Sequence, residues 1–131
     1  MEVPDYQDDP EIPVDDVLYR RVRSVDWNPG ERRPTSAAFS DSKNGTPMSV
    51  VLRSLLTADA RTPESTLDVH PGFGLVAIAV GSARAMGFAV AIRPAVVGEP
   101  AHAWVVGKKT QGLRKRLAKE CVVVVSPPRI E

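Results

Sequence analysis

The segment EPAHAWVVGKK, residues 99–109, holds one of the chain's two histidines and one of its two tryptophans. If the segment is a β-strand, His102 and Trp104 point to one face, whereas Ala103 and Val105 point to the other. An imidazole that titrates near neutral pH beside a flat indole suits a general base or a ligand-stacking pair. Because no acidic residue at a neighbouring strand position orients the ring, the favoured interpretation is a half-buried histidine bonded to a backbone carbonyl.

Cys121 is the only cysteine, so it forms no internal disulfide and fits a reducing compartment. Lys119 lies near it in sequence, and a nearby base lowers a thiol's pKa and favours a nucleophile. However, Cys121 also continues a stripe of leucines at Leu113 and Leu117, which favours a small buried side chain. With one cysteine, two histidines and no C-x-x-C or H-x-x-x-H spacing, the sequence predicts no metal site, and we expect no cofactor.

A second set of candidate residues lies in a polar segment. Arg32 and Arg33 precede a hydroxyl-rich loop that contains Thr35, Ser36, Ser40, Ser42, Thr46 and Ser49. Guanidinium groups and hydroxyls both match phosphate oxygens, so the loop is a candidate phosphate site. The alternative is a plain solvated turn.

A third set is basic and contains no acid between its first and last members: Lys108, Lys109, Arg114, Lys115, Arg116 and Lys119. On a helix these side chains would present a broad positive surface able to neutralise phosphates. Since no aromatic residue is interleaved for base stacking, a solvated face is slightly favoured.

Familiar catalytic motifs are missing from the sequence. Gly72-x-Gly74-x-x-Ala77 is formally a variant of the dinucleotide fingerprint, but that motif requires a preceding strand, and Pro71 and a helix-start signal stand there instead. The match remains only a possible anion-binding loop. No G-x-S-x-G elbow or P-loop occurs, so neither serine hydrolysis nor nucleotide hydrolysis has motif support.

The elements that must position these residues follow from periodicity and turn chemistry. We expect a long polar loop over residues 26–47, anchored to the core by Phe39. The pattern predicts strands at 17–24, 48–54, 75–80, 88–93 and 101–106 and in the run CVVVVS, which we expect to be buried on both faces as a central strand. It predicts helices at 63–69, 82–86 and 110–120, although residues 75–86 also fit one helical face.

At 131 residues and 43% hydrophobic composition, the chain suits a single core. We therefore expect an α+β fold: a single compact domain with a mixed β-sheet of about five or six strands and two or three short helices. Its boundaries are an acidic arm at 1–16, a globular domain at 17–126 and a tail at 127–131. No apolar run approaches the roughly 20 residues of a membrane span, and the first residues lack a signal pattern, so we expect a cytoplasmic protein with no membrane contact.

Charge is unevenly placed along the chain. Residues 1–16 carry seven acids and no base, which leaves residues 17–131 with seventeen bases, nine acids and a net charge of about +8. Because Pro4, Pro10 and Pro13 prevent a regular helix, the favoured interpretation of the arm is a solvated tail. The alternative is an arm that lies on a basic surface of its own body or of a partner.

Two functions follow from these patterns. The first is a binding or accessory protein without catalytic activity, which contacts a protein or nucleic-acid partner, or another copy of itself, through the basic helix and the long polar loop. The alternative is a small phosphate- or nucleotide-handling enzyme of transferase type, centred on His102 with arginines such as Arg20 and Arg32.

Overall fold

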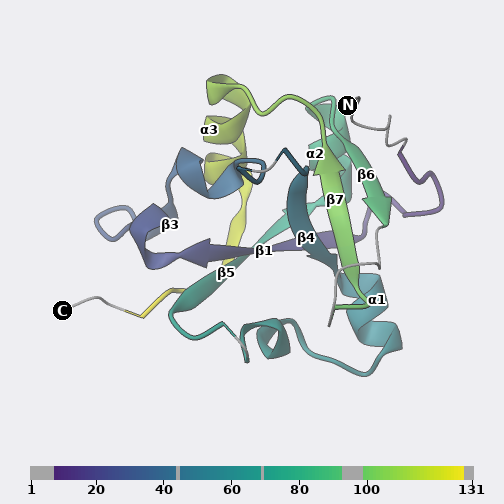
Figure 1. Ribbon diagram of the computed structural model, residues 1–131, viewed down its shortest axis with the longest axis horizontal. Helices are drawn as coiled ribbons and strands as arrows, with labels where there is room; N and C mark the ends of the chain where they lie inside the picture. The colour runs from purple at the N-terminus through teal and green to yellow at the C-terminus, as the bar shows by residue number, and fades with distance from the viewer. Residues whose placement is uncertain (1–7, 44, 69, 93–98, 129–131) are drawn as a thin grey trace.

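The computed structural model describes residues 8–43, 45–68, 70–92 and 99–128 (Figure 1). Within them the chain forms a six-stranded sheet with the order β6-β7-β4-β1-β5-β8 and a small ribbon of β2 and β3. The strands of the large sheet are β1 (Val17–Arg23), β4 (Met48–Leu52), β5 (Phe73–Ala79), β6 (Ala89–Ile92), β7 (His102–Val106) and β8 (Val122–Val125). The ribbon pairs β2 (Trp27–Asn28) with β3 (Arg33–Pro34). The α+β fold is therefore confirmed.

Three α-helices and three 3-10 helices connect the strands in the part of the chain that the structure describes. The α-helices are α1 (Arg53–Ala58), α2 (Val80–Ala85) and α3 (Gln111–Glu120). The 3-10 helices are η1 (Ser24–Asp26), η2 (Ser36–Phe39) and η3 (Pro63–Leu67). Thr110 caps α3, because its side chain accepts a hydrogen bond from the Leu113 amide at 3.2 Å.

The sheet is antiparallel throughout the described residues, so the expectation of a mixed sheet is wrong. A parallel pair of neighbours needs a long crossover, usually a helix. Here each helix instead joins strands that are not neighbours: α1 lies between β4 and β5, α2 between β5 and β6, and α3 between β7 and β8. Alternation of strands and helices in the sequence therefore does not imply parallel pairing.

The two faces of the sheet are covered differently. Leu18 and Val22 of β1 point into a large core that α2, α3 and η2 close with residues such as Phe39 and Leu117. The opposite face carries a smaller core around Tyr19, where α1 and η3 cover one end. Phe39 is fully buried, which confirms that it anchors the long loop.

The valine run at the end of the chain lies at an edge of the sheet. Among the described strands β8 pairs with β5 alone, and Val122 is 65% exposed, so the prediction of a central strand buried on both faces is wrong. Composition alone suggested burial because four consecutive valines fit a strand covered on both sides. Val123 packs on the large core while Val124 packs on the smaller one, so the two do face opposite sides.

The predicted strand at 48–54 ends early and a helix follows it directly. β4 stops at Leu52 and α1 begins at Arg53, although no residue of its own sequence caps it. Asp16 supplies the cap from a distance: its carboxylate accepts hydrogen bonds from the Ser54 amide at 3.1 Å and the Ser54 hydroxyl at 2.6 Å. A cap supplied from 38 positions away leaves no local signal in the sequence.

Residues 8–16 of the acidic arm pack against the domain, so the favoured expectation of a solvated tail is wrong for them (Figure 1). Asp8 accepts hydrogen bonds from the Arg84 guanidinium at 3.1 Å and from the Val90 amide at 2.8 Å. Asp9 accepts one from the Ile92 amide at 2.6 Å. The arm thus lies on α2 and the outer edge of β6, where Arg84 and backbone amides hold it, and not on the basic helix.

Candidate functional site

The long polar loop and the basic helix are in direct contact, because η2 and β3 pack on α3. Arg33 lies at this contact and donates hydrogen bonds to the carbonyl oxygens of Ala118, Lys119 and Cys121, the last two at 2.7 and 2.6 Å. These carbonyls end α3 without helical partners, so Arg33 caps the helix rather than lying open to a ligand.

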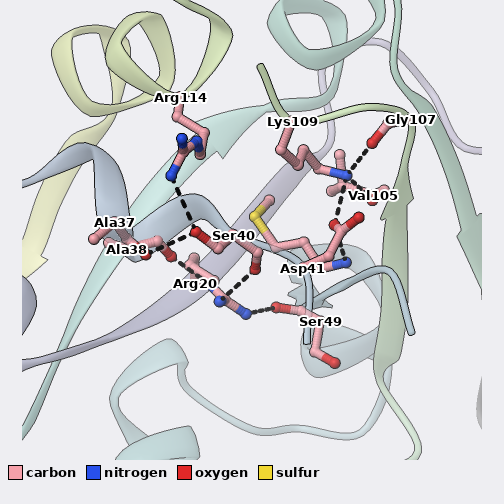
Figure 2. Close-up of polar contacts among 11 residues, drawn as sticks. Arg20, Ala37, Ala38, Ser40, Asp41, Ser49, Val105, Gly107, Lys109 and Arg114 are labelled. Atoms are coloured by element: carbon pink, nitrogen blue, oxygen red, sulfur yellow. Dashed lines mark hydrogen bonds and ion pairs between the residues drawn. The ribbon is translucent and has the colours of Figure 1, made fainter. Parts of the chain in front are cut away.

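Two further bases of the predicted surface are also used internally (Figure 2). Lys109 is nearly buried and forms an ion pair of 2.8 Å with Asp41, while its amine also donates to the carbonyls of Val105 and Gly107. Arg114 donates to the Ser40 hydroxyl at 3.5 Å, and its Nε is buried without a hydrogen-bond partner. Burial lowers the pKa of Lys109, and the bond to Asp41 partly offsets this shift.

The remaining cations of the surface lie in solvent. Arg32, Lys108, Lys115 and Lys119 are exposed. Arg116 is also exposed and forms an ion pair of 2.9 Å with Glu120, one helical turn away. The open positive surface is therefore smaller than six bases on one helix suggest.

The environments of Cys121 and of the two candidate glycines indicate structural roles and no chemistry. Cys121 is buried, and burial raises its pKa despite the nearby guanidinium of Arg33, which keeps the thiol protonated. Gly72 lies in a turn that leads into β5, and Gly74 lies within that strand, packed so closely on Pro127 that a Cβ atom would be 2.6 Å from its ring. A strand after the glycines, where the dinucleotide motif needs a helix, rules out that motif here.

His102 begins β7 and is buried, with its ring edge-on to Trp104 at a centroid distance of 6.0 Å. The two side chains share one face of the strand, as its alternation predicts. Cross-strand pairing places His102 beside Val51 and Val51 beside Tyr19, which makes a row of three buried side chains across that face. His102 therefore lies in the same cross-strand row as Tyr19 of the interior strand β1.

The next row of the sheet is interrupted by a fork between β1 and β4. Their ladder contains only two pairs and ends at Tyr19 and Val51, while β1 continues beside β5 for its whole length. The Arg20 guanidinium bridges the fork: Nη1 donates to the Ser49 carbonyl at 2.8 Å and Nε to the Ala38 carbonyl at 3.0 Å (Figure 2). A third bond of 3.3 Å runs from Nη2 to the Ser40 carbonyl.

A cavity of about 210 Å³ opens at this fork. Its lining includes cationic, apolar and hydroxyl groups from four strands, among them Arg21, Val51, Phe73, Ser49 and His102. We call it the fork cavity. Of the residues that the sequence singled out, His102, Arg20 and Ser49 line the cavity, whereas no residue of the basic helix does.

The carboxylates in the cavity lining are already paired. Glu99 forms a two-pronged ion pair with Arg61, with N–O distances of 2.7 and 2.9 Å, and this bond is the main reason that the pKa of Glu99 is lowered. Asp26 is bonded to Arg23 at 3.1 Å. Neither acid is therefore available to neutralise another cation.

Two cationic groups of the lining have no such partner. Arg20 bonds only neutral carbonyls, and burial together with the charge of Arg21 lowers its pKa to about 10. Arg21 makes no hydrogen bond and no ion pair within the described part of the chain. Burial lowers the pKa of Arg21 too, with only the more distant charge of Glu99 opposing the shift.

This arrangement can hold an anion. A half-buried guanidinium has five N–H donors, and charge-assisted hydrogen bonds strengthen where water is partly excluded. Sequence reasoning missed the cavity, because the alternating basic residues in YRRVR indicate only a partly exposed strand. The signal was the odd parity of Arg21, which places it on the face of Tyr19 rather than on the face of Arg20.

Comparisons with protein-family models, curated proteins and solved structures give no match for this chain. Among the described residues, no helix has the length and apolar character needed to cross a bilayer. No group of three or more histidine, cysteine, aspartate or glutamate side chains in that same part of the chain is placed to hold a metal ion.

Proposed function

We propose that this chain is a binding domain without catalytic activity and that its ligand is an anion held in the fork cavity. The observation that carries the proposal is the half-buried guanidinium of Arg21, which lines the cavity without a hydrogen bond or an ion pair to any residue that the structure describes. Burying an unpaired cation is costly, and a bound anion would supply the missing partner.

Binding is favoured over catalysis because both carboxylates of the cavity lining are already ion-paired. Proton transfer needs a group within hydrogen-bond reach and a second group that orients it. Glu99 and Asp26, the two carboxylates of the lining, are each ion-paired to an arginine. The alternative of a phosphate-handling enzyme centred on His102 remains a second outcome of the same experiment, because His102 borders the cavity.

The test is calorimetric titration of the purified chain with phosphate, sulfate and acetate at low ionic strength. We expect millimolar or tighter binding of at least one anion, and its loss in Arg21→Gln. Arg116→Gln is the matched control, because it removes an exposed arginine on α3. Absence of binding by all three anions contradicts the proposal, and turnover of a phosphate ester that depends on His102 would favour the enzyme.

A second candidate is a macromolecular partner at the joint surface of α3 and the polar loop. The contact through Arg33 supports it, because this contact places the exposed cations Arg32, Lys115 and Lys119 on neighbouring elements. Binding of a short DNA duplex would support this surface if the binding weakens steeply with salt and is lost when Arg32, Lys115 and Lys119 are all replaced by glutamate. A second copy of the chain or a protein partner is the alternative if no duplex binds.

A cytoplasmic location belongs to the same proposal. Cys121 is free and buried, which suits a compartment where thiols stay reduced.

A further inference from the structure

We infer that the fork cavity selects a phosphate monoester, whose dianionic head lies at Arg21 and whose organic group lies against Phe73. This inference rests on the proposed anion binding and names the class of ligand. It follows from three properties of the lining: its uncompensated charge, its donors and its apolar wall.

The first property is charge. The lining contains three arginines and two carboxylates, and Arg23 is neutralised by Asp26 while Glu99 belongs to Arg61. Arg20 and Arg21 remain, so the cavity carries about two uncompensated positive charges. A phosphate monoester carries about −1.5 to −2 at pH 7, whereas a carboxylate or a sulfate ester carries one negative charge. The dianion is therefore the better electrostatic match.

The second property is the set of donors around the open space. Arg21 offers a planar fork that matches two phosphate oxygens. Ser49 of β4 lines the same cavity, and its hydroxyl group can donate a further hydrogen bond. A tetrahedral phosphate has three terminal oxygens to receive these bonds, while a planar carboxylate has two.

The third property is the apolar wall. Phe73 lies opposite Arg23 in the β1–β5 ladder, and its ring is braced edge-on by His70 at a centroid distance of 5.5 Å. Val51 continues the apolar lining from β4. An inorganic phosphate would leave this wall in water, but a flat organic group would cover it and gain free energy from the buried apolar surface. The ligand is therefore an ester rather than the free ion.

The experiment compares four probes by calorimetry at pH 7.5 and low ionic strength: phenyl phosphate, phenyl sulfate, benzoate and inorganic phosphate. We expect phenyl phosphate to bind at least about tenfold more tightly than phenyl sulfate, since the extra charge strengthens at least one charge-assisted hydrogen bond. We also expect it to bind more tightly than inorganic phosphate, because only the ester covers Phe73.

Variants separate the head from the wall. Arg21→Gln should weaken phenyl phosphate about ten- to hundredfold and remove its advantage over phenyl sulfate. Phe73→Leu should weaken phenyl phosphate but leave inorganic phosphate unchanged, and Arg116→Gln should bind all probes as the parent chain does. Circular dichroism and the unfolding midpoint of each variant verify that it folds.

The failures of the two proposals differ. If phenyl sulfate or benzoate binds as tightly as phenyl phosphate and still depends on Arg21, the cavity binds anions but the monoester inference is overturned. If inorganic phosphate binds as tightly as its phenyl ester, the role of the Phe73 wall is overturned. If no probe binds, both the inference and the proposed function fall.

Discussion

Arg20 is joined to Ser49 across a gap in the sheet: its Nη1 donates a 2.8 Å hydrogen bond to the Ser49 carbonyl, just beyond the last pair of the β1–β4 ladder. A continued ladder would place Arg21 opposite Ser49. Instead the side chain of Arg20 takes the place of the missing backbone bonds, and the space that this leaves is the fork cavity. The Arg20 side chain therefore holds β1 and β4 together at the fork and also forms part of the cavity lining.

Removal of this bridge should destabilise the domain. Arg20→Met leaves the carbonyls of Ala38, Ser40 and Ser49 without their donor, and we expect a loss of about 2–4 kcal/mol in the free energy of unfolding. Urea denaturation measures it, with Arg116→Met as the exposed control. Equal midpoints for the two variants would show that the bridge does not hold the fork.

Arg21 should behave in the opposite way. Its guanidinium is half-buried and has no partner among the described residues, so Arg21→Met removes a desolvated charge without breaking a bond. We expect unchanged or increased stability, by up to about 1 kcal/mol, together with loss of anion binding. The thermal unfolding midpoint in the absence of anions tests this expectation, and a marked drop would reveal a structural role for Arg21.

The Glu99–Arg61 pair predicts a pH dependence of stability. The pKa of Glu99 is lowered in the folded chain, mainly by the bond to Arg61, so its contribution is fully present above its unfolded value of about 4.5. That contribution is lost as the pH falls through the lower folded value. Glu99→Gln should cost about 1–3 kcal/mol at pH 7, because it removes the two-pronged ion pair and leaves Arg61 only the longer contact of 4.0 Å with Asp59.

Urea titrations of both proteins at pH 7, 5, 4 and 3.5 measure this dependence. The difference in unfolding free energy between them should narrow below pH 4.5. A difference that stays constant over this range would show that the carboxylate charge is not what stabilises the folded chain.

The sequence predicted most elements because their signals are local. The strand at 17–24 and the helix at 110–120 match β1 and α3 within one residue at each end, and Thr110 caps the helix at its first turn. The predicted helix at 82–86 is α2, which begins two residues earlier, at Val80. In each case periodicity or a capping residue lies within the element itself.

The features that sequence reasoning missed depend on distant partners. The α1 helix is capped by Asp16, and the arm is held by Arg84, both from far along the chain. The fork cavity arises because β4 leaves β1 after two pairs, and the fork is bridged by hydrogen bonds from Arg20 to η2 and β4, 18 and 29 positions away. Contacts between residues so far apart in the sequence cannot be predicted from residue types and local spacing.

Leu117 should be the most sensitive position of α3. Its side chain is 1% exposed and packs in the large core, so Leu117→Ala should cost about 2–5 kcal/mol. Leu113→Ala is the matched control, because Leu113 is only partly buried on the same helix. If the two variants unfold at the same urea concentration, α3 is peripheral to the core.

The last prediction concerns how the acidic arm is held. The Arg84 guanidinium donates to the Asp8 carboxylate at 3.1 Å and to the carbonyls of Ile12 and Asp9 at 2.8 and 2.9 Å. Arg84→Met removes all three bonds while keeping the length of the side chain. We expect residues 8–12 to detach and the Ile92 amide, which Asp9 covers, to exchange with solvent at least about tenfold faster.

Arg53→Met is the matched control, because Arg53 is exposed on α1 and bonds the arm only at the Asp15 carbonyl, at 3.1 Å. Hydrogen exchange at Ile92 and at buried Val90 reports detachment, whereas fully buried Val76 of β5, four strands away from β6, reports global unfolding. If Arg84→Met accelerates exchange only in β6, the contacts of Arg84 hold the arm on the domain. Equal acceleration at Val76 would mean that the whole domain is destabilised. If Arg84→Met leaves Ile92 as protected as Arg53→Met does, buried Ile12 rather than the charged contact holds the arm.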